Sequence, residues 1–357
     1  METRGARGLA PRARLPAGPL ALLGFSLAAV AFLVEMVGGV WDILYHLDGG
    51  VEVFWTPPHL LLYGGIAVTF GASANGLLFA RRAGLPAAFQ AALGTVLLGG
   101  LLKFGAGLFD SWWHAALGVD DALSPPHVLM LVGMGISGFG LSRAGALLRE
   151  TWDRRTRSGG FARAARAAAP FAWTGWLFAL LGLAWVLSHP GFAGDPFLPE
   201  PWRRLGVAFA FAVVLGFVPA AARASLQSRG PATAVLGLFG TTTMLVRLVQ
   251  DEASAAFVAL PFAGLAAGAV LDAALGSRGS PWARGAARVG EGLTLGLLGV
   301  VLLDIAIGDM TGGLAGNGLL FPIALATGGL AGSLLGPVLA RRLAAPAVVG
   351  PAPAGIR

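Results

Sequence analysis

Two copies of one short motif bring together side chains that could bind a metal ion. Each copy has one aspartate and two histidines at the spacing Asp-x3-His-x12-His. These residues are Asp42, His46 and His59 in the first copy and Asp110, His114 and His127 in the second, 68 residues later. Four of the five histidines of the chain therefore lie at equivalent positions of a repeat. Without cysteine, the chain can offer only imidazole and carboxylate ligands, which suit copper, zinc, iron or manganese.

The local sequence predicts how one copy brings its ligands together. Asp42 and His46 are four residues apart and so share one face of a helix. A short loop with glycine follows, and Thr56 and Pro57-Pro58 are typical of the N-cap and first turn of the next helix. An antiparallel hairpin of these two helices would return His59 to Asp42 and His46. The spacing fits two separate metal sites or one shared centre.

Four more charged residues occur at equivalent positions of the repeat. Glu35 and Lys103 each precede the motif aspartate of their copy by seven residues, on the same helix face and near the middle of the membrane. An unpaired charge there costs about 3 kcal/mol or more, so we expect Glu35 to pair with Lys103. The pair would support the ligands or belong to a proton path, or be purely structural. Glu52 and Asp120, in the two loops, would bind cations or simply be solvated.

The composition indicates an integral membrane protein. Of 357 residues, 56% are hydrophobic and 12% charged, against about 25% charged residues in soluble domains. The net charge of +7 comes from arginines clustered between apolar segments, a pattern that sets membrane orientation rather than one that binds nucleic acid. The lack of cysteine excludes disulfides and thiolate metal sites.

The apolar segments predict an all-α membrane protein with about ten transmembrane helices, the first four forming two tandem hairpins. After a first helix from about Pro19, the segments centre near residues 68, 100, 135, 178, 212, 240, 264, 298 and 329. The expected regions are a basic cytoplasmic lead (1–17), a four-helix metal-binding unit (18–142, repeats 41–59 and 109–127), a basic cytoplasmic loop (143–167), a six-helix unit (168–343) and a disordered tail (344–357). The arginine clusters predict that both termini are cytoplasmic and that both motifs face outward.

The motif Asp42-x3-His46-x12-His59 resembles the copper-binding motif in one membrane-embedded component of the copper membrane monooxygenases, the particulate methane and ammonia monooxygenases. The resemblance covers about residues 20–140 and assigns Asp110, His114 and His127 to the second ligand set of that family. The family has asparagine where this chain has Asp110, and a slightly longer gap between the second pair of histidines. The resemblance implies copper, location in a bacterial inner membrane, oxidation of a small apolar substrate with O2, and partner membrane subunits including one with a cupredoxin domain.

Two other functions remain open from the sequence. A membrane protein that stores or transfers copper would use the same ligands without turnover. A membrane zinc hydrolase would use an open zinc position to activate water. No catalytic residue is assigned apart from the ligands. The second half of the chain, which has no motif, is expected to serve as a scaffold or to contact another subunit.

Overall fold

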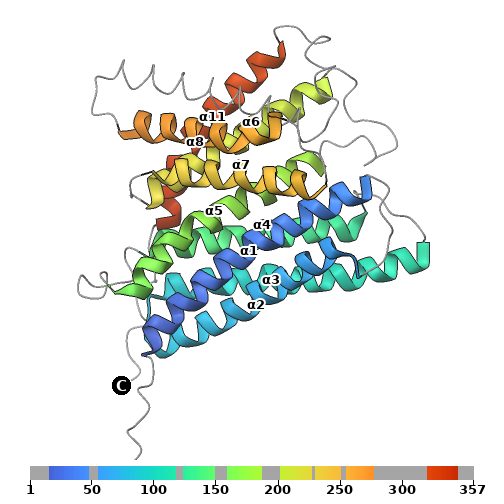
Figure 1. Ribbon diagram of the computed structural model, residues 1–357. Coiled ribbons are helices and arrows are strands. Elements are labelled where there is room, and N and C mark those ends of the chain that lie inside the picture. Colours follow the sequence, from blue (N-terminus) through green and yellow to red (C-terminus); the bar gives the residue numbers. More distant parts are fainter. Residues whose placement is uncertain are drawn as a thin grey trace, which may run out of the picture.

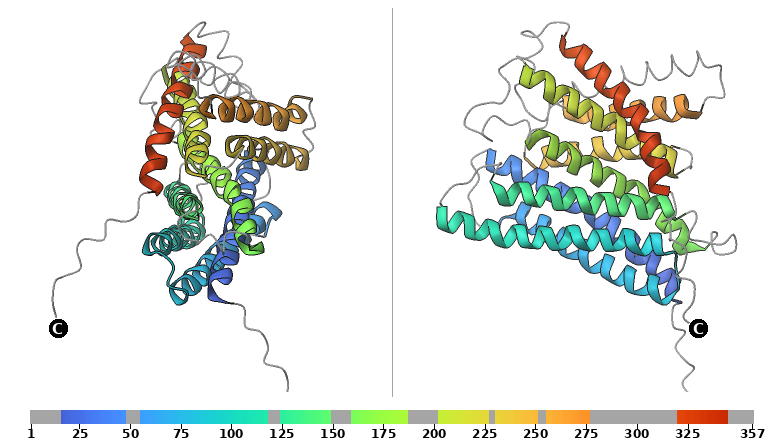
Figure 2. Two further views of the ribbon diagram at one scale, coloured as in Figure 1. Left: turned by 90° about the vertical axis from the view of Figure 1, so that its left-hand side faces the viewer. Right: turned by 180° about the vertical axis from the view of Figure 1, so that it is seen from behind.

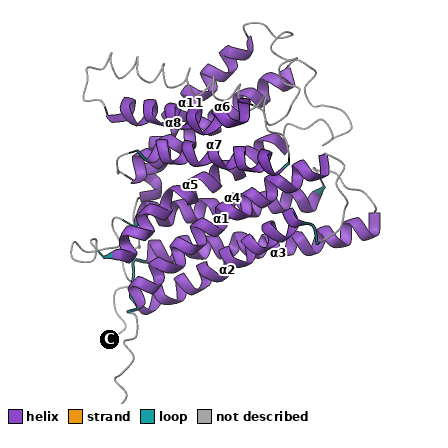
Figure 3. Ribbon diagram, viewed as in Figure 1, coloured by secondary structure: helices purple, strands orange, loops and turns teal. Residues whose placement is uncertain are grey.

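In the computed structural model, secondary structure is described for residues 16–47, 55–117, 124–148, 159–186, 202–226, 230–250, 255–276 and 320–344. In these ranges all the secondary structure is helical (Figure 3). The helices are α1 (Ala17–Leu47), α2 (Pro57–Arg82), α3 (Ala87–Leu117), α4 (Pro125–Leu147), α5 (Gly160–Val186), α6 (Trp202–Leu226), α7 (Pro231–Val249), α8 (Ala255–Gly276) and α11 (Leu320–Ala344).

Eight of the described helices are long and apolar enough to cross a membrane, and α8 contains a shorter apolar stretch, Val258–Ala273. The predicted class, an all-α membrane protein, is confirmed. The count of ten helices is not, because the helix expected near residue 298 lies outside the described residues. The lead 1–15 and the tail 345–357 also lie outside them.

The first four helices form the two predicted hairpins, α1 with α2 and α3 with α4 (Figure 1). Small residues allow the helices of each hairpin to approach closely. A Cβ atom at Gly24 would lie 2.6 Å from the Cα of Gly76, and one at Gly140 would lie 2.8 Å from the carbonyl oxygen of Ala92. Gly24 is the repeat equivalent of Ala92, so the close approach of the two helices lies at the same level in both hairpins.

Helix α5 joins the hairpins by packing against both α1 and α4. Gly175 leaves room for the ring of Phe32 on α1, and Gly138 on α4 leaves room for Trp176. The loop expected over 143–167 is shorter than predicted, because α4 continues to Leu147 and α5 begins at Gly160. Arginines fit such helix ends, since their long side chains can carry the charge to the membrane surface.

In the second half, α6 packs along α11, and α7 packs against α8 (Figure 2). Asp272 on α8 accepts hydrogen bonds from the first turn of α7, from the backbone N–H groups of Ala232 (3.3 Å) and Thr233 (2.9 Å) and from the Thr233 hydroxyl (2.7 Å). Its Oδ1 also lies 3.1 Å from Nε of Arg223 on α6. Asp272 therefore satisfies N–H groups that would otherwise lack a helical partner, and links three helices.

Candidate metal centre

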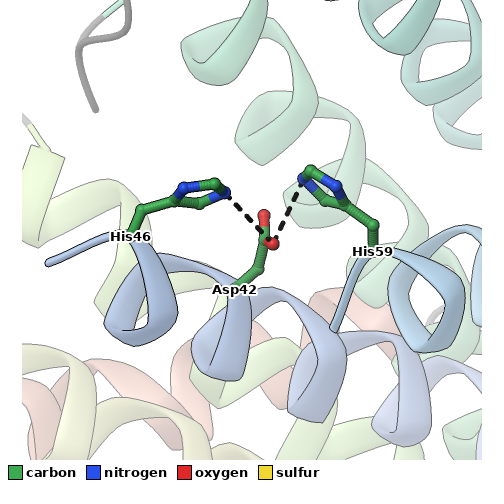
Figure 4. Close-up of side chains that lie close together, drawn as sticks. All are labelled: Asp42, His46 and His59. Atoms are coloured by element: carbon green, nitrogen blue, oxygen red, sulfur yellow. Dashed lines mark ion pairs between the residues drawn. The ribbon is translucent and has the colours of Figure 1, made fainter. Parts of the chain in front are cut away.

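The first group of ligands lies where the end of α1 meets the start of α2 (Figure 4). Asp42 and His46 are on the last turns of α1, and His59 is in the first turn of α2. Oδ1 of Asp42 lies 3.6 Å from Nε2 of His46 and 3.2 Å from Nε2 of His59. The carboxylate thus points between the two imidazole rings, as the hairpin prediction required.

The second group repeats this arrangement at the end of α3 and the start of α4. Oδ1 of Asp110 lies 3.4 Å from Nε2 of His114 and 3.3 Å from Nε2 of His127. Within each group, one potential ligand atom from every residue lies within 4.8 Å of the others. The six residues thus form two groups of three, which we call group one (Asp42, His46, His59) and group two (Asp110, His114, His127).

The two groups differ in exposure. The histidines of group one are 23% and 19% exposed, whereas those of group two, His114 and His127, are 31% and 33% exposed. Both aspartates are similarly protected, at 17% and 18%. Group two is therefore more accessible from its imidazole side.

The donor atoms in each group fit a metal ion. Three ligands at about 2.0–2.2 Å from a tetrahedral ion lie roughly 3.3 Å from one another. The four aspartate–histidine distances, 3.2–3.6 Å, are close to this separation. Moreover, Oδ1 of Asp42 and Oδ1 of Asp110 are buried and accept no hydrogen bond from the part of the chain described here. A cation would satisfy both oxygens, since buried polar atoms normally have a partner.

The residues that begin α2 and α4 are also repeated. The backbone oxygens of Thr56 and Ser124 accept hydrogen bonds from Leu60 N (3.0 Å) and Val128 N (3.1 Å), so both residues occupy the N-cap position. The predicted N-cap position of Thr56 is confirmed, although neither hydroxyl makes a cap hydrogen bond. The helix starts are instead favoured by the prolines in the first turn, whose fixed φ suits a helix and which need no N–H partner there.

Below the two groups, the predicted pairing of Glu35 with Lys103 is confirmed. Nζ of Lys103 donates a hydrogen bond to Oε1 of Glu35 at 2.6 Å, and both side chains are fully buried. Nζ also lies 5.5 Å from the centre of the Phe32 ring, within range of a cation–π interaction. The pair connects α1 of the first hairpin with α3 of the second.

The repeat extends further down the hairpins than the motif alone suggests. A Cβ atom at Gly65 would lie 2.7 Å from Cα of Glu35, and one at the equivalent Gly133 would lie 2.7 Å from Cγ of Lys103. These glycines leave the space in which the ion pair is enclosed. The signal was available in the sequence, since the glycines are separated by the same 68 residues as the paired charges.

The rings of two tyrosines lie next to group one, and the sequence did not single out either of them. The ring of Tyr45 lies edge-on to His46, with centroids 5.7 Å apart, and the ring of Tyr63 lies 6.0 Å from His59. Trp55 and Trp112 are 74% and 58% exposed, as expected for aromatic residues at a membrane surface. Glu52 and Asp120 lie outside the described residues, so their expected role stays a prediction.

No protein family, curated protein or solved structure matches this chain. Its function is therefore argued from its own residues. Those residues establish a helical, multi-pass membrane protein with two Asp/His/His groups that could hold a metal.

Proposed function

We propose that this chain is a copper-binding membrane protein that provides the copper sites of a membrane monooxygenase. One observation carries the proposal: two Asp/His/His groups with identical spacing converge at the same end of two tandem hairpins. A single interfacial histidine needs no ligand to explain it. Two three-residue groups with converging donor atoms are better explained by two bound ions.

Copper is favoured by the donor set together with the motif. Among divalent first-row metals, copper binds most tightly to a given set of nitrogen and oxygen ligands. The spacing Asp-x3-His-x12-His also resembles the copper-binding motif of the particulate methane and ammonia monooxygenases. Bound copper would supply the redox chemistry needed to oxidise a small apolar substrate with O2. The chain's own residues would hold the ion, and a partner subunit with a cupredoxin domain would complete the enzyme.

Zinc is the second candidate. Two histidines and one carboxylate, with a fourth position left for water, are a recurrent ligand set of zinc hydrolases. Each group offers this set and no fourth protein ligand within the described residues. A zinc protein would contain no redox-active ion, so the metal itself decides between the two functions.

The test is the metal content and electron paramagnetic resonance spectrum of protein expressed with ample copper. We expect about two Cu(II) ions per chain with nitrogen ligands, and loss of both in the His46→Ala/His114→Ala variant. His189→Ala, which removes the one histidine outside the motifs, is the matched control and should retain both ions. Zinc in place of copper would support the hydrolase, and copper bound without O2-dependent turnover when partner subunits are present would support storage or transfer. No metal at all would contradict every one of these functions.

We infer that both groups face outward from the inner membrane. Arg81 and Arg82 end α2, and Arg341 and Arg342 end α11, so these basic turns lie at the other end of the helices from the ligands. Because the chain has no native cysteine, single cysteines can report the orientation. In intact spheroplasts, a membrane-impermeant maleimide should label Trp55→Cys and spare Ala83→Cys; the reverse pattern would refute the orientation.

A further inference from the structure

One tyrosine contacts group one and also lies against the helix that carries Asp110 and His114 of group two. Tyr63 follows His59 by one helical turn on α2, and the two rings are 6.0 Å apart. Its ring also lies against Gly107 on α3, where a Cβ atom would be 2.9 Å from Cε1 and 3.2 Å from the hydroxyl oxygen. Gly107 is one turn before Asp110. The same phenol therefore lies beside group one and over the helix turn that leads to group two.

The charges of both groups reach this phenol. Asp42 and Asp110 each act electrostatically on the Tyr63 side chain, which is only partly exposed. A phenol has a single O–H to donate, so its hydrogen can point toward one acceptor at a time. A metal ion that neutralises one carboxylate would change the electrostatic field at the hydroxyl, and with it the direction in which the O–H points.

The second copy has no equivalent of this link. The residue equivalent to Tyr63 is Leu131, whose side chain lies against α5, 3.1 Å from where a Cβ atom of Gly182 would be. The glycine equivalent to Gly107 is Gly39, which faces Leu62 and Met134. The only other tyrosine of the chain, Tyr45, lies edge-on to His46 of group one. Tyr63 thus breaks the symmetry of the repeat at the point where α2 of the first hairpin meets α3 of the second.

We propose that Tyr63 is a positioning residue shared by the two groups, through which metal bound in one group changes the affinity and ligand field of the other. The inference rests on the proposed function, since it requires both groups to bind metal. Groups that surround metal ligands and hold them in place tune the ion, commonly by 10–100-fold in affinity, about the range expected here. Tyr63 would act on group one through its contact with His59, and on group two through the helix turn at Gly107 and the charge of Asp110, without binding either ion.

The test uses the full-length protein, stripped of metal and titrated with Cu(II). His46→Ala isolates group two, and His114→Ala isolates group one. We expect Tyr63→Phe, which keeps the ring and removes the hydroxyl, to shift the copper spectrum and lower the affinity about 10-fold in both backgrounds. Tyr45→Phe is the matched control: it makes the same change beside His46 and should affect group one only.

Coupling is measured in protein with both groups intact. Filling group one should change the affinity of group two by about fivefold or more, at the low end of typical coupling between sites, and Tyr63→Phe should reduce the ratio to near one. An unchanged group-two spectrum and affinity in His46→Ala/Tyr63→Phe would overturn the inference while leaving copper binding intact. Wild-type protein that binds no copper would overturn the proposed function and the inference together.

Discussion

The two hairpins α1–α2 and α3–α4 have the same ligands at their metal-binding ends but different residues closer to the middle of the helices. At the level of the buried pair, the first hairpin has Glu35 and the second has Lys103. In the second turn of the second helix of each hairpin, the first hairpin has Tyr63 and the second has Leu131. The metal-binding end is symmetrical, whereas the contacts between the hairpins are not.

The charge difference determines which hairpins can pair. Two copies of the first hairpin in this arrangement would bring Glu35 against Glu35, and two copies of the second would bring Lys103 against Lys103. Like charges in a buried, low-dielectric position repel strongly. Only the mixed pair satisfies both charges, so the ion pair favours packing of the first hairpin against the second.

The largest expected effect comes from removing one charge of this pair. Lys103→Met leaves the Glu35 carboxylate fully buried without its cation, and breaking such a pair typically costs about 3–5 kcal/mol. The measurement is the free energy of unfolding in detergent, followed by tryptophan fluorescence. The metal groups lie two turns away, so any copper that the folded variant binds should keep its wild-type spectrum.

The charge-swapped variant Glu35→Lys/Lys103→Glu is the control for that prediction. It restores an ion pair between the same two helices and should recover more than half of the lost stability. If it is as unstable as Lys103→Met, then the local packing around each residue, including Phe32 beside Lys103, matters more than the pairing of charges.

This pair also shows what the sequence could and could not reveal. Glu35 and Lys103 were predictable partners because both fall at one position of a repeat and neither charge could stay unpaired in the membrane. The ligand groups were predictable for a similar reason, since helix periodicity and the proline-marked helix start constrain where each side chain lies. Both predictions combine the local geometry of helices with the symmetry of the sequence repeat.

Other features depended on contacts that no local pattern encodes. Asp272 accepts a hydrogen bond from Ala232, 40 residues earlier in the first turn of α7, and no local sequence pattern at either residue predicts this partner. Tyr63 was indistinguishable from other interfacial aromatics until α2 and α3 were placed side by side. Thr56 occupies the N-cap position that the sequence indicated, but its hydroxyl makes no cap hydrogen bond, and the prolines that follow favour the first turn instead.

A smaller effect is expected from filling the space beside the buried pair. In Gly65→Ala, the new methyl group would meet the backbone of Glu35 at 2.7 Å and force α1 and α2 apart, costing about 1–3 kcal/mol. Gly133→Ala would meet Cγ of the buried Lys103 at 2.7 Å and the backbone carbonyl oxygen of Gly99 at 2.9 Å, so it would force α3 and α4 apart. We therefore expect Gly133→Ala to cost a similar amount in the same unfolding assay.

Gly64→Ala provides the control, because no atom lies within 4 Å of a Cβ at that position. It should be neutral or stabilising by up to about 1 kcal/mol, since alanine favours helix more than glycine does. Equal losses in Gly64→Ala and Gly65→Ala would show that glycine is needed for something other than close helix packing.

The smallest loss of stability is expected from breaking the ion pair in the second half of the chain, between Arg223 and Asp272. Arg223 and Asp272 are 24% and 13% exposed, against 0% for Glu35 and Lys103. In Arg223→Met, Asp272 still accepts hydrogen bonds from the first turn of α7 and keeps some contact with water, so we expect a loss of about 1 kcal/mol or less. Salt sharpens the contrast, because the Debye length falls from about 30 Å at 0.01 M to about 3 Å at 1 M. The loss in Arg223→Met should shrink at high salt, while the loss in Lys103→Met should persist; equal salt dependence would mean that water reaches the pair between the hairpins.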